Sequence, residues 1–312
     1  MDRPTKGKDI PLKEDDPEIK AWDELGSRFL EESKTDLEIS YQLSRFQDDG
    51  SKRRRLFFLQ QALEKCVKSS LPELGVTMMI IPYFSSSHIF AEHRTPGKPL
   101  DILLERGKRI FNAFKNPRDL SHNPAKRLEI KAFLEDCYLF ALAVGDLGWA
   151  ETCLACTKLM KERSIPRTIS EIEKESREFD RIRTEGARIL QGVKNPKSIS
   201  KEQAGKLFAF LREATFHETK KSCLTLTLLE LLAEFEQVSR YPDTVGLPKG
   251  LLDDLNRVHE TIQRLVSESD QRNNNSEEIF NPIELLLQRG KFSEENVRNM
   301  VSSTQGGSAE AQ

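Results

Sequence analysis

Apolar residues recur at intervals of three and four throughout this chain, and this spacing most limits what it can fold into. Residues three or four apart share a face of an α-helix, whereas a strand needs apolar and polar residues to alternate. Leu56, Leu59, Leu63 and Val67 have the helical spacing, and no segment alternates convincingly. The sequence therefore predicts an all-α fold, either a multi-helix bundle or an irregular, solenoid-like stack of helical hairpins.

Consecutive helix pairs span about 35–45 residues each, which is typical of helical-repeat proteins. The pairs do not align with one another residue for residue. A helical repeat is thus an expectation from length alone.

The first third of the chain predicts four helices. The first begins at Pro17, and Thr35 with Glu38 forms a capping-box pattern that predicts the start of a second. The apolar stripe of this second helix, Leu37, Tyr41 and Phe46, stops at 48–50, and a third helix carries the leucines of 56–67. The apolar run 76–81 fits a buried strand or a buried helix. We favour a helix with Pro72 in its first turn and Pro82 at its end.

The middle of the chain predicts a helical hairpin and a long helix. Residues 126–144 and 147–163 flank the tight turn Gly145-Asp146. The following segment, 169–193, has an almost heptad-like seam, which indicates a long helix packed within its own domain or a homo-oligomer interface.

Three further helices are expected after this seam. Ser200 with Gln203 forms another capping-box pattern, and the leucine-rich segment 219–240 predicts the central helix. In 251–267, His259 lies on the apolar stripe, where a partly buried side chain is expected.

Composition divides the chain into five parts. Residues 1–16 and 304–312 are predicted disordered tails, 17–269 a helical domain with 85–99 as a candidate subdomain boundary, 270–278 a linker, and 279–303 short C-terminal helices.

Charge is distributed unevenly. The chain has 48 Lys and Arg against 50 Asp and Glu, yet 94–131 contains ten basic and four acidic residues. Together with 52–55 this segment is a candidate groove for nucleic acid or an acidic partner. The alternative is that these residues are solvated helix faces paired with acids such as Glu105 and Glu129, and 52–55 could equally be a nuclear-import signal. The candidate binding residues are Lys52, Arg53, Arg54, Arg55, Arg94, Lys98, Arg106, Lys108, Arg109, Lys115, Arg118, Lys126 and Arg127.

Motifs that carry chemistry are not found. The sequence contains no Walker loop, GxSxG, GxGxxG or HExxH pattern, so we expect no enzymatic activity, no cofactor and no bound metal. Cys153 and Cys156 form a single CxxC within a helical pattern, which favours helix packing over a zinc or redox site. Five cysteines, an odd number, suggest reduced thiols and an intracellular protein, cytoplasmic or nuclear. The apolar runs are too short to cross a membrane, so no membrane partner is expected.

Two functions remain open from the sequence. The favoured one is a non-enzymatic scaffold or adaptor that binds another protein within a larger complex. The alternative is a nucleoprotein-like RNA- or DNA-binding protein that uses 52–55 and 94–131.

Overall fold

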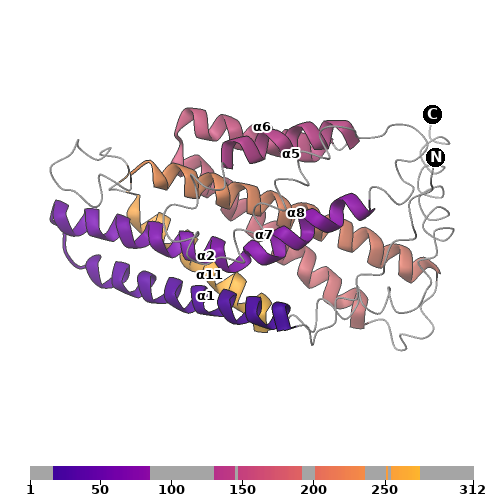
Figure 1. Cartoon of the computed structure of the whole chain (residues 1–312), viewed down its shortest axis with the longest axis horizontal. Helices are drawn as coiled ribbons and strands as arrows, with labels where there is room; N and C mark the ends of the chain where they lie inside the picture. The colour runs from indigo at the N-terminus through magenta and orange to yellow at the C-terminus, as the bar shows by residue number, and fades with distance from the viewer. Residues whose placement is uncertain are drawn as a thin grey trace.

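The protein is all-α, as predicted. A computed structural model describes residues 17–84, 130–144, 147–191, 201–235, 251 and 254–274, and within these ranges it contains helices and no strand. The helices are α1 (Pro17–Leu43), α2 (Asp49–Phe84), α5 (Ile130–Val144), α6 (Leu147–Glu162), α7 (Ile165–Gln191), α8 (Lys201–Ala233) and α11 (Leu255–Asn274). Figure 1 shows the α5–α6 hairpin and α1 on opposite sides of the molecule, with α8 between them.

α1 and α2 form a long helical hairpin. Asp48 caps α2, because its carboxylate accepts the backbone N–H of Ser51 at 2.9 Å. The helix start predicted at Thr35 is wrong: α1 continues through it, and the Thr35 hydroxyl donates to the backbone carbonyl of Glu31, four residues earlier. Leu37 is buried, but Tyr41 and Phe46 are largely exposed, so the predicted stripe of this segment faces the core only in part.

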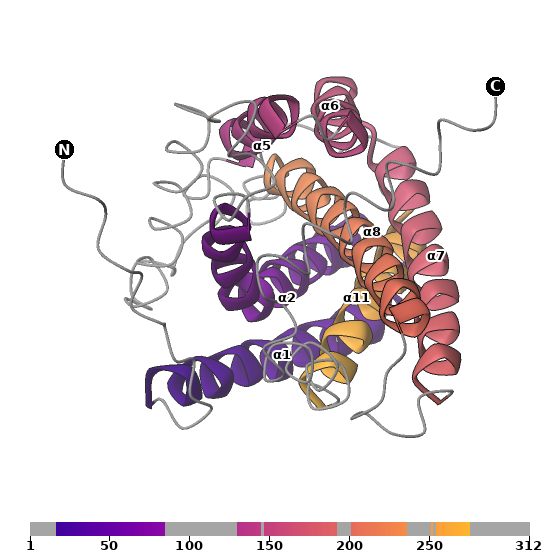
Figure 2. The same cartoon turned by 90° about the vertical axis from the view of Figure 1, so that its right-hand side faces the viewer.

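α2 is one helix where the sequence predicted two. The segment 76–81 is helical, as favoured, but the helix neither begins near Pro72 nor ends at Pro82. Figures 1 and 2 both show α2 bent along its length. Proline lacks the N–H for the i→i−4 hydrogen bond, so a proline inside a helix is the ordinary cause of such a bend.

α5 and α6 pack against each other and confirm the predicted hairpin of 126–144 and 147–163 from residue 130 onward, whereas 126–129 lie outside the described residues. α6 ends in a Schellman motif. Arg163 adopts a left-handed conformation with φ of 50°, and the N–H of Ser164 donates to the carbonyl of Leu159 at 3.2 Å. The chain then turns directly into α7.

α7 packs along α8 of the same chain. The seam residues Ile169, Ile172 and Ile182 are buried, and a methyl group at Gly186 would overlap the ring of Phe210 on α8. The seam thus has an intramolecular partner, the first of the two expectations for 169–193. A homo-oligomer through this segment stays a prediction.

α8 is the central helix. It packs against α7, α6, α2 and α5, and its residues Leu224, Leu228 and Leu232 are almost completely buried. It begins one residue after Ser200 and continues without interruption to Ala233, so the break expected before residue 219 does not occur.

α11 packs against α2 and α1 and completes the bundle. Leu255, His259, Ile262 and Val266 are buried, as their spacing predicted. The helix extends to Asn274, so the first part of the predicted linker 270–278 is helical.

Several predicted features lie outside the described residues. These are the tails 1–16 and 304–312, the boundary 85–99, the short helices 279–303 and the Gly145-Asp146 turn.

Candidate functional site

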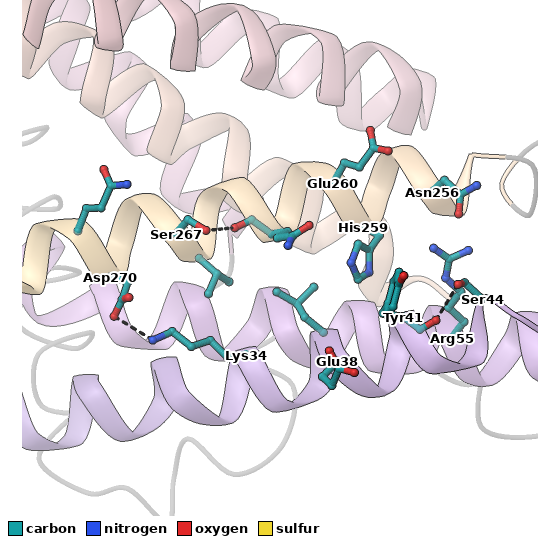
Figure 3. A pocket seen from close by; sticks show the side chains of 14 residues that line it. Lys34, Glu38, Tyr41, Ser44, Arg55, Asn256, His259, Glu260, Ser267 and Asp270 are labelled. Atoms are coloured by element: carbon teal, nitrogen blue, oxygen red, sulfur yellow. Dashed lines mark hydrogen bonds and ion pairs between the residues drawn. The ribbon is translucent and has the colours of Figure 1, made fainter. Parts of the chain in front are cut away.

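An open groove of about 730 Å³ lies between α1 and α11, with the first turns of α2 at one end. α1 contributes Leu37 and Tyr41 and α11 contributes His259 and Val266, which repeat at helical spacing along the two facing sides. Figure 3 shows Tyr41 and His259 facing each other from the two helices. The groove therefore follows from the packing of two segments that are more than 200 residues apart in the sequence.

Arg55 occupies the α2 end of the groove. It lies in the second turn of α2 and is only 8% exposed. Its Nε has no hydrogen-bond partner among the residues that the structure describes, and burial lowers the pKa of the guanidinium. Arginine stays protonated at neutral pH, so the groove contains a buried positive charge.

His259 lies close to this charge. Its Nδ1 is 3.3 Å from the hydroxyl of Ser40, and its ring centroid is 6.3 Å from that of Tyr41. Burial, followed by the charge of Arg55, lowers the pKa of His259 below its ordinary value, so the neutral imidazole is favoured. Ser40 is fully buried and does not line the groove, so this serine and histidine pair cannot reach a substrate there.

The other end of the groove is closed by ion pairs. Lys34 on α1 lies 3.0 Å from Asp270 on α11 and 2.7 Å from Glu31. Glu38 and Glu260 stand exposed along the groove. The charged end at Lys34 is thus neutralised by neighbouring acids, whereas no acid among the described residues pairs with Arg55.

The predicted basic site is only partly described. Lys52 and Arg53 are half-buried, Arg54 is exposed and Arg55 is buried, so the four do not form one exposed cluster. Lys131, the last residue of the segment 94–131, is exposed on α5. The other candidate residues lie outside the described ranges: Arg94, Lys98, Arg106, Lys108, Arg109, Lys115, Arg118, Lys126 and Arg127.

A cluster of buried thiols joins α5, α6 and α8. Cys153 and Cys156 are fully buried on α6, which fits the packing role predicted for them. The thiol of Cys223 on α8 is hydrogen-bonded to Cys153 and lies near Cys137. That bond and burial raise the pKa of Cys223, and burial raises the pKa of Cys156 to about 11. These thiols therefore stay protonated and unreactive at neutral pH.

The sequence did not reveal this cluster because its members come from three helices. The described residues contain no group of three or more His, Cys, Asp or Glu side chains placed to hold a metal ion.

Buried ion pairs connect α7, α8 and α11. Glu175, 1% exposed, accepts from His217 and Lys220 at 2.7 Å each. Lys221 is 2.9 Å from Glu268 and lies over the ring of Phe179. Each of these charges has a partner, and none of these residues lines the groove between α1 and α11, so we interpret them as contacts that hold the helices in register.

Comparison of the whole chain with models of known families, with curated proteins and with solved structures found no match. Among the described helices, none combines the length and the apolar character needed to cross a membrane.

Proposed function

We propose that the protein is a non-enzymatic helical adaptor that binds a partner protein in the groove between α1 and α11. The observation that carries the proposal is Arg55, a buried cation that lines the groove and has no acidic partner among the described residues. An unpaired buried charge costs several kcal/mol, and a partner that brings an anion recovers much of that cost.

The groove offers both kinds of contact that a protein partner needs. Tyr41 is 52% exposed beside the buried Leu37 and Val266, so an apolar side chain can pack against an aromatic ring there. Asn256, Ser44 and Gln263 supply hydrogen-bonding groups at the rim. Tyrosine and arginine are the residue types that dominate binding energy at protein interfaces.

The mixed charge of the groove argues against nucleic acid as its occupant. Its lining carries two cations, Lys34 and Arg55, and three acids, Glu38, Glu260 and Asp270. A groove that follows a phosphate backbone needs an excess of positive charge. The nucleic-acid hypothesis thus rests on residues 52–54 and 94–131, and the experiment below includes it as an outcome.

Blocking the groove tests the adaptor proposal. Ser267 is a small, exposed residue in the lining on α11, and a tryptophan there would fill part of the groove. Ala155 is a small, exposed residue on α6, far from the groove in the fold, so Ala155→Trp is the matched control. Wild type and both variants would be purified from extract of the native cells with and without nuclease treatment, and the bound protein and nucleic acid quantified.

We expect a stoichiometric partner to bind wild type and Ala155→Trp but to be lost from Ser267→Trp. Equal recovery with both variants would place partner binding elsewhere. Recovery of nucleic acid alone before nuclease treatment, with no protein partner after it, would favour the nucleic-acid hypothesis.

A further inference from the structure

The charges around Arg55 define what the groove can accept. Lys34, the other lining cation, is already paired with Asp270 and Glu31. Arg55 makes no ion pair with any described residue, and its Nε is buried without a hydrogen-bond partner. One positive charge is therefore available to a ligand, and it lies at the α2 end of the groove.

The single positive charge of Arg55 limits which anionic group suits the groove. A carboxylate carries one negative charge and accepts two parallel N–H bonds from a guanidinium, which matches a single arginine. A phosphate monoester carries about −1.5 to −2 at neutral pH. A phosphate in the groove would place this larger negative charge near a single cation and near the like-charged carboxylates of the exposed Glu38 and Glu260. A carboxylate, by contrast, balances the charge of Arg55 and adds no further negative charge to the groove.

We infer that the partner inserts an aspartate or glutamate side chain into the groove and pairs its carboxylate with the guanidinium of Arg55. This inference rests on the proposed function and specifies the partner as an acidic peptide segment. The residue beside the acid would contact Tyr41 and Val266, which line the same groove. Figure 3 shows Arg55 at the end of the groove that also holds Asn256 and Ser44, whose polar groups can bind the peptide backbone.

Short random peptides displayed on phage provide a probe that does not require the partner to be known. Selection on the purified full chain should enrich peptides with an acid at one fixed position next to an apolar residue. The affinity of a selected peptide would then be measured by fluorescence polarisation against wild type, Arg55→Gln and Arg54→Gln. Arg54 is the exposed neighbour on α2, so its substitution changes the net charge equally.

We expect Arg55→Gln to weaken peptide binding at least about tenfold, because the pair is shielded from water, and Arg54→Gln to leave it nearly unchanged. Replacing the acidic side chain of the peptide by its amide should weaken binding to wild type by a similar factor. Arg55→Gln should weaken binding of this amide peptide little further. This amide series leaves the protein unaltered, so it tests the pair even if Arg55→Gln fails to fold.

Three results would overturn the inference. These are selected peptides without a fixed acid, equal losses for Arg54→Gln and Arg55→Gln, and tighter binding when phosphoserine replaces the acid. Ser267→Trp separates this failure from failure of the proposed function. If Ser267→Trp abolishes binding of peptides that ignore Arg55, the groove remains the binding site and only the acidic specificity is wrong. If peptides ignore both substitutions, the groove itself is not the site.

Discussion

His259 and Arg55 show how single buried polar residues shape this fold. The imidazole lies among residues from α1 and α2, where burial and the neighbouring positive charge both oppose its protonation. The carboxylates of Glu38 and Glu260 act in the opposite direction with smaller effect. His259 is therefore neutral in the folded protein over a pH range in which the unfolded chain would protonate it.

We predict that His259 makes the protein less stable in mild acid. Its pKa is lowered on folding, so its stabilising contribution is complete above the unfolded pKa of about 6.5 and decreases as pH falls below that value. The unfolding free energy of wild type and His259→Gln would be measured in urea between about pH 7.5 and 5.5. As pH falls over this interval, the unfolding free energy of His259→Gln should decrease less than that of wild type. An equal decrease in the two proteins would contradict a lowered pKa for His259.

Individual residues also show where sequence reasoning succeeds. The run Lys52, Arg53, Arg54, Arg55 looks uniform in the sequence, but each residue turns about 100° from the last around the helix axis. Only Arg55 joins the buried face with Leu56 and Leu59. The leucine spacing predicted that face correctly, whereas the partner across the groove, α11, follows from packing that no local pattern encodes.

The start of a helix is hard to predict from the sequence of this chain. The pattern Thr35 with Glu38 has the form of a capping box, yet Thr35 lies in the middle of α1 and its hydroxyl bonds backwards to Glu31. Asp48 caps α2 by the same chemistry that was expected of Thr35. A hydroxyl can make either bond, so the choice depends on tertiary contacts such as those that bury Asp36, Leu37 and Ser40.

These two positions give a matched stability test. Asp48→Ala removes the acceptor for the Ser51 N–H and should lower the free energy of unfolding measurably, because an N-cap side chain stabilises the helix start. Thr35→Ala removes a mid-helix hydroxyl at an exposed site and should change it by less than about 0.5 kcal/mol. Chemical denaturation of both variants would measure the difference. A larger loss for Thr35→Ala would mean that a helix begins there after all.

At the scale of the whole molecule, the seven described helices bring together residues that the sequence keeps apart. Ser40 meets His259, Glu175 meets His217, and Cys153 meets Cys223, each pair joining different helices. Periodicity predicted the all-α class, the α5–α6 hairpin and the buried stripes, because each depends on local spacing. The groove could not be predicted, since it depends on which helices pack together and at what offset.

The apolar seam of α7 likewise shows that local spacing does not reveal which helix a given helix packs against, in the same chain or in a second copy. Its spacing suits a second helix, and in the structure that helix is α8 of the same chain. The partner surface that we propose is instead the groove between α1 and α11, where Arg55 is buried without an acidic partner among the described residues.

The most direct measurement is site-specific photo-cross-linking in the native cells. A photoreactive amino acid would replace Gln263, an exposed groove residue on α11, or Glu151, an exposed residue on α6 outside the groove. We expect a discrete, nuclease-resistant protein adduct at 263 and none at 151. Equal labelling at both positions, adducts that nuclease removes, or a cross-link from 263 to another segment of the same chain would contradict it.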